Sequence, residues 1–293
     1  MTDEDVPTLV EPDWLEDRLN DPDLRVVDCT VELTYDNETG EMEGGPRYDD
    51  WEESHIPGSV FVDLMRDLSE TEDPEYSFQL PNPASFAEEM EAVGIGDDTR
   101  VVAYDSARDD LSNEWAARLW WLLRAFGHDQ VGVLNGGWGR WTDENRPTSS
   151  AKPSTPNVTF TPEYQPTLVA DKEDVVEYVS GDSENEACVV NALWQDDYES
   201  LHIPNTENVP SVGESAVIDT ETNTYDSTDE IRSRFEEVGA EESNKVVTYC
   251  GAGIAASSAA FAAYVSGFED VAVYDGSLEE WRADPDLPVE SVE

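Results

Sequence analysis

Short apolar runs alternate along the chain with longer runs in which apolar residues have helical spacing. In the first half, strand-like runs lie at 26–27, 101–103 and 131–133. Residues 113–126 repeat apolar side chains at the spacing of one helix face. In the second half, 246–249 is strand-like, and 254–265 is an alanine-rich helical run that Gly267 ends. This alternation predicts an α/β fold with a mainly parallel sheet flanked by helices.

The same anchors return in the same order in the two halves. His-Ile-Pro occurs at 55–57 and 202–204, and a strand-like run ends in Tyr104-Asp105 and again in Tyr249-Cys250. Farther on, Gly136 and Trp141 correspond to Gly276 and Trp281. Repeated anchors in a fixed order indicate a duplicated unit. We expect tandem domains at 1–145 and 165–293, joined by a linker at 146–164 that is rich in proline, serine and threonine.

The charge balance limits the partners of this chain. It has 293 residues, of which 16 are basic and 68 acidic, giving a net charge of −52. Such a surface repels nucleic acid and anionic membranes, so neither is an expected partner. A disordered acidic chain is the alternative, but the periodic apolar runs disfavour it. In about 1 M salt the electrostatic screening length is only roughly 3 Å, so crowded surface carboxylates repel one another weakly. We therefore expect a halophile's cytoplasmic protein.

Further signals concern location and metal binding. No apolar run has membrane-spanning length, and the start of the chain does not resemble a secretory signal. The cysteines are widely spaced, without a C-x-x-C pair, so neither a disulfide framework nor a zinc site is expected. The isolated histidines likewise show no metal spacing. The sequence leaves the oligomeric state open.

The three cysteines differ in their surroundings. Cys29 and Cys188 lie in or beside apolar strand runs, which is typical of buried structural thiols. Cys250 instead follows a strand-like run and opens a glycine-containing turn before a helix. Ligands of parallel α/β sheets bind beyond the carboxyl ends of the strands. A structural role for Cys250 is therefore disfavoured, and it is our candidate catalytic residue.

The turn after Cys250 has the composition of an anion cradle. Gly251 and Gly253 leave backbone N–H groups uncovered, close to the N-terminus of the following helix. Such a nest should lower the pKa of the Cys250 thiol and stabilise a persulfide anion. The predicted substrate-binding residues are those whose amides form the nest: Gly251, Ala252, Gly253, Ile254 and Ala255.

Two other functions can be read from the same turn. Residues 251–256 match G-x-G-x-x-A, and the acidic Asp275 follows, as in dinucleotide-binding domains. Too little chain remains after Asp275 to complete such a domain, and the first half lacks the fingerprint. A cysteine-dependent phosphatase would need an arginine six residues after the cysteine to clamp phosphate, but Ala256 stands there.

Several longer motifs are shared with a known family. HIPGS at 55–59, LNGGWGRW at 134–141, YCGAGIAAS at 249–257 and DGSLEEW at 275–281 resemble the two-domain rhodanese family in an acidic, haloarchaeal-type form. That family comprises the thiosulfate and 3-mercaptopyruvate sulfurtransferases. The resemblance implies two rhodanese-like domains, with the catalytic cysteine only in the second. Cys250 would take a sulfane sulfur from the small-molecule donor and pass it to cyanide or a thiol, without cofactor or metal.

Departures from the family pattern leave one alternative open. Relatives often carry serine where this chain has Ala252, threonine at Ala255, and Asp-Ala-Arg where it has residues 191–193. The altered loop is compatible with a non-catalytic sulfur carrier or binding module.

Supporting residues have more ordinary expectations. Asp105, which replaces the cysteine in the first half, is expected to be a solvated turn residue, with a local catalytic carboxylate as the alternative. Asp275 is expected to be a turn or capping residue, with a role in holding the region around the active-site loop as the alternative. His202 and Trp281 recur in both halves, which favours scaffold roles. Arg108 is a candidate to face the site, with a surface ion pair as the alternative.

Overall fold

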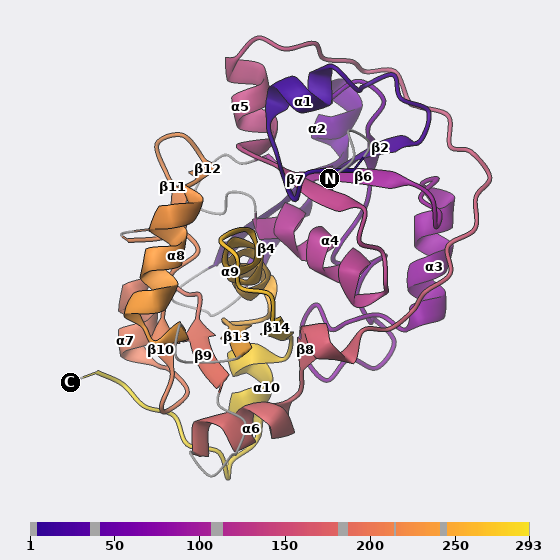
Figure 1. Ribbon diagram of the computed structural model, residues 1–293. Helices are drawn as coiled ribbons and strands as arrows, with labels where there is room; N and C mark the ends of the chain where they lie inside the picture. The colour runs from indigo at the N-terminus through magenta and orange to yellow at the C-terminus, as the bar shows by residue number, and fades with distance from the viewer. Residues whose placement is uncertain are drawn as a thin grey trace. The chain divides into compact units, whose positions relative to one another are not determined.

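The computed structural model describes residues 5–35, 42–106, 114–180, 187–213, 215–240 and 245–292 (Figure 1). The chain forms two compact units. The first unit consists of Met1–Thr71 and Leu80–Tyr164, and the second consists of Glu72–Gln79 and Gln165–Glu293. Within the described residues, no helix combines the length and the apolar character needed to cross a bilayer.

The first unit is built on a parallel five-stranded sheet in the order β1-β7-β6-β2-β5. Its strands are β1 (Leu9–Val10), β2 (Leu24–Asp28), β5 (Val60–Phe61), β6 (Arg100–Tyr104) and β7 (Val131–Leu134). An antiparallel hairpin follows β2, formed by β3 (Val31–Tyr35) and β4 (Met42–Pro46). The helices are α1 (Pro12–Glu16), α2 (Tyr48–Glu53), α3 (Pro83–Ala92), α4 (Glu114–Ala125) and α5 (Gly137–Asp143).

The second unit repeats this plan with a parallel sheet in the order β10-β9-β13-β14-β8. Its strands are β8 (Val169–Ala170), β9 (Ala187–Asn191), β10 (Glu207–Asn208), β13 (Lys245–Tyr249) and β14 (Val271–Tyr274). A separate antiparallel pair joins β11 (Ile218–Asp219) to β12 (Thr224–Tyr225). The helical segments are η1 (Pro166–Leu168), α6 (Lys172–Ser180), α7 (Gln195–Ser200), α8 (Thr228–Glu237), α9 (Ile254–Val265) and α10 (Ser277–Ala283).

Alternation along β13 places helices on both faces of the second sheet. Val247 and Tyr249 pack in a core cluster with Trp281 of α10 and Val175 of α6. Thr248, which points to the other face of the strand, donates its hydroxyl hydrogen to the carbonyl of Ala256 in α9 at 2.8 Å. Figure 1 shows α9 beside β13 and β14. The α/β architecture expected from the sequence is confirmed.

The repeated anchors occupy matching positions in the two units. Trp141 and Trp281 are almost fully buried, and their indole N–H groups donate to the carbonyls of Pro147 and Pro288, both at 2.8 Å. The repeated tryptophans are therefore core residues.

The repeated histidines also have matching contacts. His55 stacks on Trp51 and His202 on Tyr198, and each imidazole hydrogen-bonds with the carbonyl of that aromatic residue. These contacts lie within α2 and α7 and the turns that follow them, which agrees with scaffold roles.

Residues 146–164, expected to be a linker, lie along the first unit. The amide of Thr161 donates to Asp97 at 2.6 Å, and the amide of Glu163 donates to the carbonyl of Phe126 at 2.9 Å. Phe160 is buried and packs edge-on against Phe86. The segment is therefore anchored by backbone hydrogen bonds and an aromatic contact.

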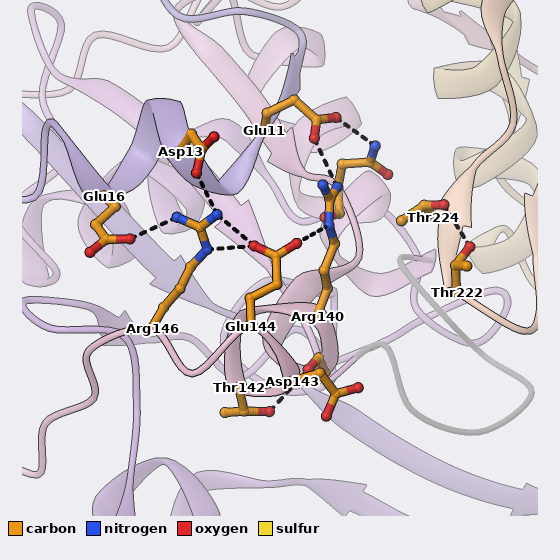
Figure 2. Close-up of polar contacts among 12 residues, drawn as sticks. Glu11, Asp13, Glu16, Arg140, Thr142, Asp143, Glu144, Arg146, Thr222 and Thr224 are labelled. Atoms are coloured by element: carbon orange, nitrogen blue, oxygen red, sulfur yellow. Dashed lines mark hydrogen bonds and ion pairs between the residues drawn. The ribbon is translucent and has the colours of Figure 1, made fainter.

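An ion-pair cluster ties α1 to α5 and the residues after it (Figure 2). Arg146 pairs with Asp13, Glu16 and Glu144 at 2.5 to 2.7 Å, and its side chain is only 12% exposed. Glu144 also binds Arg140 at 2.8 Å. Such networks are worth more than isolated surface pairs, which contribute about 0–1 kcal/mol. Two of the few cations in this acidic chain therefore have a structural role.

Candidate active site

The central feature of the site is the loop that joins β13 to α9. The strand ends at Tyr249, Cys250 is the next residue, and the helix begins at Ile254. Gly253 is the N-cap and has φ +82°, a left-handed conformation that favours glycine. The loop therefore lies at the carboxyl edge of the sheet, where the sequence placed it.

The Cys250 thiol lies within the loop that was expected to cradle it. The N–H of Gly253 donates to Cys250 Sγ at 3.1 Å. Cys250 itself is 3% exposed, whereas Gly251, Ala252, Ile254 and Ala255 around it are half-buried. An amide donor and the N-terminus of a twelve-residue helix favour negative charge on the sulfur. Of the five predicted cradle residues, Gly253 contacts the thiol through its amide. The other four lie in the same loop and the first turn of α9, and their role as a cradle stays a prediction.

A second loop, between β14 and α10, supports the first. The hydroxyl of Ser277 accepts a hydrogen bond from the Cys250 amide at 3.0 Å and donates one to the carbonyl of Tyr274 at 2.9 Å. The amides of Leu278 and Glu279 donate to the carbonyls of Cys250 and Gly251, both at 3.0 Å. Sequence reasoning treated this DGSLEEW stretch as a repeat anchor and missed the role of Ser277. A usable signal was its difference from the first half, where Gly137 stands and has no hydroxyl.

The other two cysteines are buried, as expected. Cys29 is fully buried and donates its thiol hydrogen to the carbonyl of Tyr104, and burial raises its pKa well above the usual range. Burial raises the pKa of Cys188 to about 11. Neither thiol is suited to form a thiolate near neutral pH.

The expectation that Asp105 is a solvated turn residue is wrong. Its side chain is 1% exposed, and one carboxylate oxygen, Oδ2, accepts hydrogen bonds from the amides of Trp115 and Ala116 at 3.1 and 3.0 Å. Those amides belong to the first turn of α4, whose unpaired N–H groups need acceptors. In the first unit, the Asp105 carboxylate therefore accepts hydrogen bonds from two N–H groups in the first turn of α4. Arg108 lies outside the described residues.

The strands next to β6 and β13 end in different residues, Asp28 and Asn191, at matching register positions. Asp28 Oδ1 accepts the amide of Thr30 at 3.0 Å, and Asn191 Oδ1 accepts the amide of Leu193 at 2.8 Å. Burial raises the pKa of the Asp28 carboxyl to about 6, against the hydrogen bonds from Thr30 that lower it. An amide thus fills the same position in the second unit without a titrating group.

We expect Asp28→Asn to change the pH dependence of stability. Because the pKa of Asp28 is higher in the folded protein than its ordinary 3.8, its contribution to stability is present below that value and is lost as pH rises through 6. Ionisation costs about 3 kcal/mol at most. We compare the unfolding free energy of the variant with that of wild type. This difference should be about 1–3 kcal/mol more favourable to the variant at about pH 8 than at about pH 4. Urea unfolding at both pH values, with wild type in parallel, measures this, and a pH-independent difference would contradict it.

Most cations of the second unit are engaged in ion pairs. Of Lys172, Arg232, Arg234, Lys245 and Arg282, the first four pair with carboxylates, and Arg282 is exposed on α10. Among the described residues, no cluster of three or more histidine, cysteine or acidic side chains has an arrangement that could hold a metal ion. The polar contacts of Cys250 described above are with the amides of Gly253 and Leu278 and the hydroxyl of Ser277.

Comparisons with known proteins agree with this architecture. A family pattern described as "Rhodanese-like domain" matches residues 11–144 and 175–284. The chain is 37% identical to the thiosulfate sulfurtransferase of Gallus gallus over 251 residues, which cover 82% of this chain and 83% of that protein. It is 33% identical to the 3-mercaptopyruvate sulfurtransferase of Mus musculus over 250 residues, covering 81% and 80%.

A solved structure has the same fold over nearly its whole length. SseA from Escherichia coli, described with the 3-mercaptopyruvate sulfotransferases, superposes with a TM-score of 0.76 at 25% sequence identity. The match covers 93% of this chain and 99% of SseA. With both family matches falling on the two units that the sequence repeat marks out, the chain belongs to the rhodanese family.

Proposed function

We propose that the protein is a sulfurtransferase in which Cys250 carries the transferred sulfur as a persulfide. The observation that carries this proposal is the position of Cys250 Sγ, at the end of β13 and 3.1 Å from the amide nitrogen of Gly253. Gly251, Ala252, Gly253, Ile254 and Ala255 would hold the sulfur anion with their backbone amides. The names of the relatives, thiosulfate and 3-mercaptopyruvate sulfurtransferase, support this reaction class.

The reaction divides into two transfers through one covalent intermediate. With thiosulfate, the Cys250 thiolate attacks the outer sulfur, the S–S bond breaks, and sulfite leaves with the electron pair. With 3-mercaptopyruvate, the thiolate attacks the thiol sulfur, the C–S bond breaks, and the carbon takes the electron pair and the thiol proton to give pyruvate. Either way Cys250 becomes a persulfide anion. Cyanide or a thiolate then attacks the outer sulfur and releases the Cys250 thiolate.

The cations of the second unit favour 3-mercaptopyruvate as the donor. Thiosulfate is a dianion, whereas 3-mercaptopyruvate carries one carboxylate charge. Lys172, Arg232, Arg234 and Lys245 are paired with Asp284, Glu236, Asp226 and Asp270. A second donor charge would therefore depend on amide dipoles and on the exposed Arg282, in a protein with a net charge of −52.

We expect kcat/KM to be about tenfold higher with 3-mercaptopyruvate than with thiosulfate, since one poorly neutralised charge costs about 1 kcal/mol or more. Thiocyanate formation from cyanide measures the thiosulfate reaction, and pyruvate release measures the other, in the same buffer and salt. A higher kcat/KM for thiosulfate would contradict the charge argument. Sulfur loading of Cys250 without turnover on either donor would favour the carrier alternative.

The proposed setting is the cytoplasm of a halophile. The excess of carboxylates supports it, because about 1 M salt would screen their mutual repulsion within roughly 3 Å. The same charge disfavours nucleic acid and anionic membranes as partners. The expected partners are therefore the small-molecule sulfur donor and the cyanide or thiol acceptor of the proposed reaction.

A further inference from the structure

Residues Glu72–Gln79 belong to the second unit, although β5 and α3 on either side of them in the sequence belong to the first. The segment has no helix or strand and turns on itself, with Gln79 accepting the amide of Glu75 at 2.7 Å. Phe78 is buried and has φ +58°. A bulky residue adopts this conformation only where its surroundings hold it, at a cost of about 1–3 kcal/mol. The segment is therefore held in a defined conformation.

Two neighbouring residues of this segment bind the loop before α10 and its first turn. The hydroxyl of Tyr76 donates to Asp275 Oδ2 at 3.2 Å. The amide and the hydroxyl of Ser77 both donate to Glu279 Oε1 at 3.0 Å. Asp275 is 2% exposed, so its carboxylate depends on protein donors such as Tyr76.

The residues that Tyr76 and Ser77 bind also lie on either side of the contact that holds Cys250. Ser277, whose hydroxyl accepts the Cys250 amide, stands between Asp275 and Glu279 in the sequence. Glu279 contacts Ser77 through its side chain and Gly251 through its amide. Contacts therefore run without a break from the 72–79 segment to the backbone of the Cys250 loop.

We propose that Tyr76 and Ser77 are positioning residues for Cys250, acting through Asp275 and Glu279. They hold the β14–α10 loop so that Ser277 and the amides of Leu278 and Glu279 keep the nucleophile loop in place. Tyr76 also donates to the buried carboxylate of Asp275, two residues before Ser277, and so fixes the start of that loop. The effect on turnover rests on the proposed function, whereas the effect on the Cys250 thiol does not.

The test compares Tyr76→Phe and Ser77→Ala with wild type in the full-length protein. The pH dependence of Cys250 alkylation by iodoacetamide, followed by peptide mass spectrometry, reports the thiol without any donor. We expect Tyr76→Phe to move the midpoint of this profile to higher pH. It should also lower kcat/KM about tenfold, the equivalent of one hydrogen bond. Ser77→Ala should lower kcat/KM about threefold, because the Ser77 amide remains as a donor.

Matched controls remove the same chemical groups elsewhere. Tyr48→Phe deletes a hydroxyl that binds Glu52 at 3.2 Å in the first unit, and Ser233→Ala deletes one that binds Glu237 at 3.4 Å on α8. Both controls should match wild type in alkylation and turnover. An alkylation profile of Tyr76→Phe that coincides with those of wild type and Tyr48→Phe overturns the positioning role. If wild type accepts no sulfur from either donor, the proposed function fails, and the alkylation profiles still decide the role of Tyr76.

Discussion

Replacing Cys250 with serine is expected to lower sulfur transfer by at least about 10³-fold with either donor, because removing a covalent nucleophile costs factors of this size or more. The serine hydroxyl is close in size to the thiol but does not ionise near neutral pH, so it cannot attack sulfur. Mass spectrometry of wild type after exposure to donor should show one added sulfur on the peptide containing Cys250, and none on that peptide in the variant.

Cys188→Ser is the matched control for this prediction. Cys188 is also buried in the second unit, and its thiol donates to the carbonyl of Val238, with 3.5 Å between Sγ and the oxygen. Because burial raises its pKa to about 11, we expect it to take no part in transfer, and the variant should keep wild-type turnover. Turnover by Cys250→Ser, or sulfur found on Cys188 instead, would refute the assignment of the nucleophile.

Replacing Asp105 with alanine is expected to lower the free energy of unfolding by about 2–4 kcal/mol, since each buried donor left without an acceptor costs about 1–3 kcal/mol. The variant removes the carboxylate that accepts hydrogen bonds from the amides of Trp115 and Ala116. It also removes a negative charge from the N-terminus of α4, where such charge is favourable. Urea unfolding at fixed salt and pH measures the change.

Asp105→Asn provides the graded control. Its amide oxygen can still accept both hydrogen bonds but carries no charge, so we expect roughly half of the loss seen for alanine. Sulfur loading of Cys250 should be unchanged in both variants at temperatures where the protein is folded, because the Asp105 carboxylate binds the first turn of α4. A loss below about 0.5 kcal/mol for alanine, the usual range for surface substitutions, would show that the carboxylate has no structural role.

Element positions could be predicted well where the signal is local. The apolar run at 246–249 became β13, the alanine-rich run became α9 (Ile254–Val265), and Gly267 adopts φ +99° just beyond it. Hydrophobic periodicity and a terminating glycine both act over a few residues, so helices and strands can be predicted from them without knowledge of tertiary contacts. For the same reason Cys250 could be placed at a strand end before a helix.

The side-chain environments were less predictable. Nothing in the residues around Asp105 distinguishes a solvated turn from a carboxylate buried against α4, because its two amide donors lie ten and eleven residues later. Residues 146–164 have the composition of a free linker, yet Asp97 and Phe126 bind them from distant positions. Composition reports what a segment can do alone, whereas its attachment depends on partners elsewhere in the chain.

The sequence by itself determined the duplicated α/β plan and the family, and it singled out Cys250 as the candidate nucleophile, because repeated anchors and hydrophobic period are properties of the chain alone. Only the tertiary structure decided that Ser277 holds the Cys250 amide and that Tyr76 and Ser77 bind the same loop. Such contacts join residues 27 to 202 positions apart in the chain. No local pattern records them, since a single hydrogen bond constrains a pair of atoms in space and leaves the intervening sequence free.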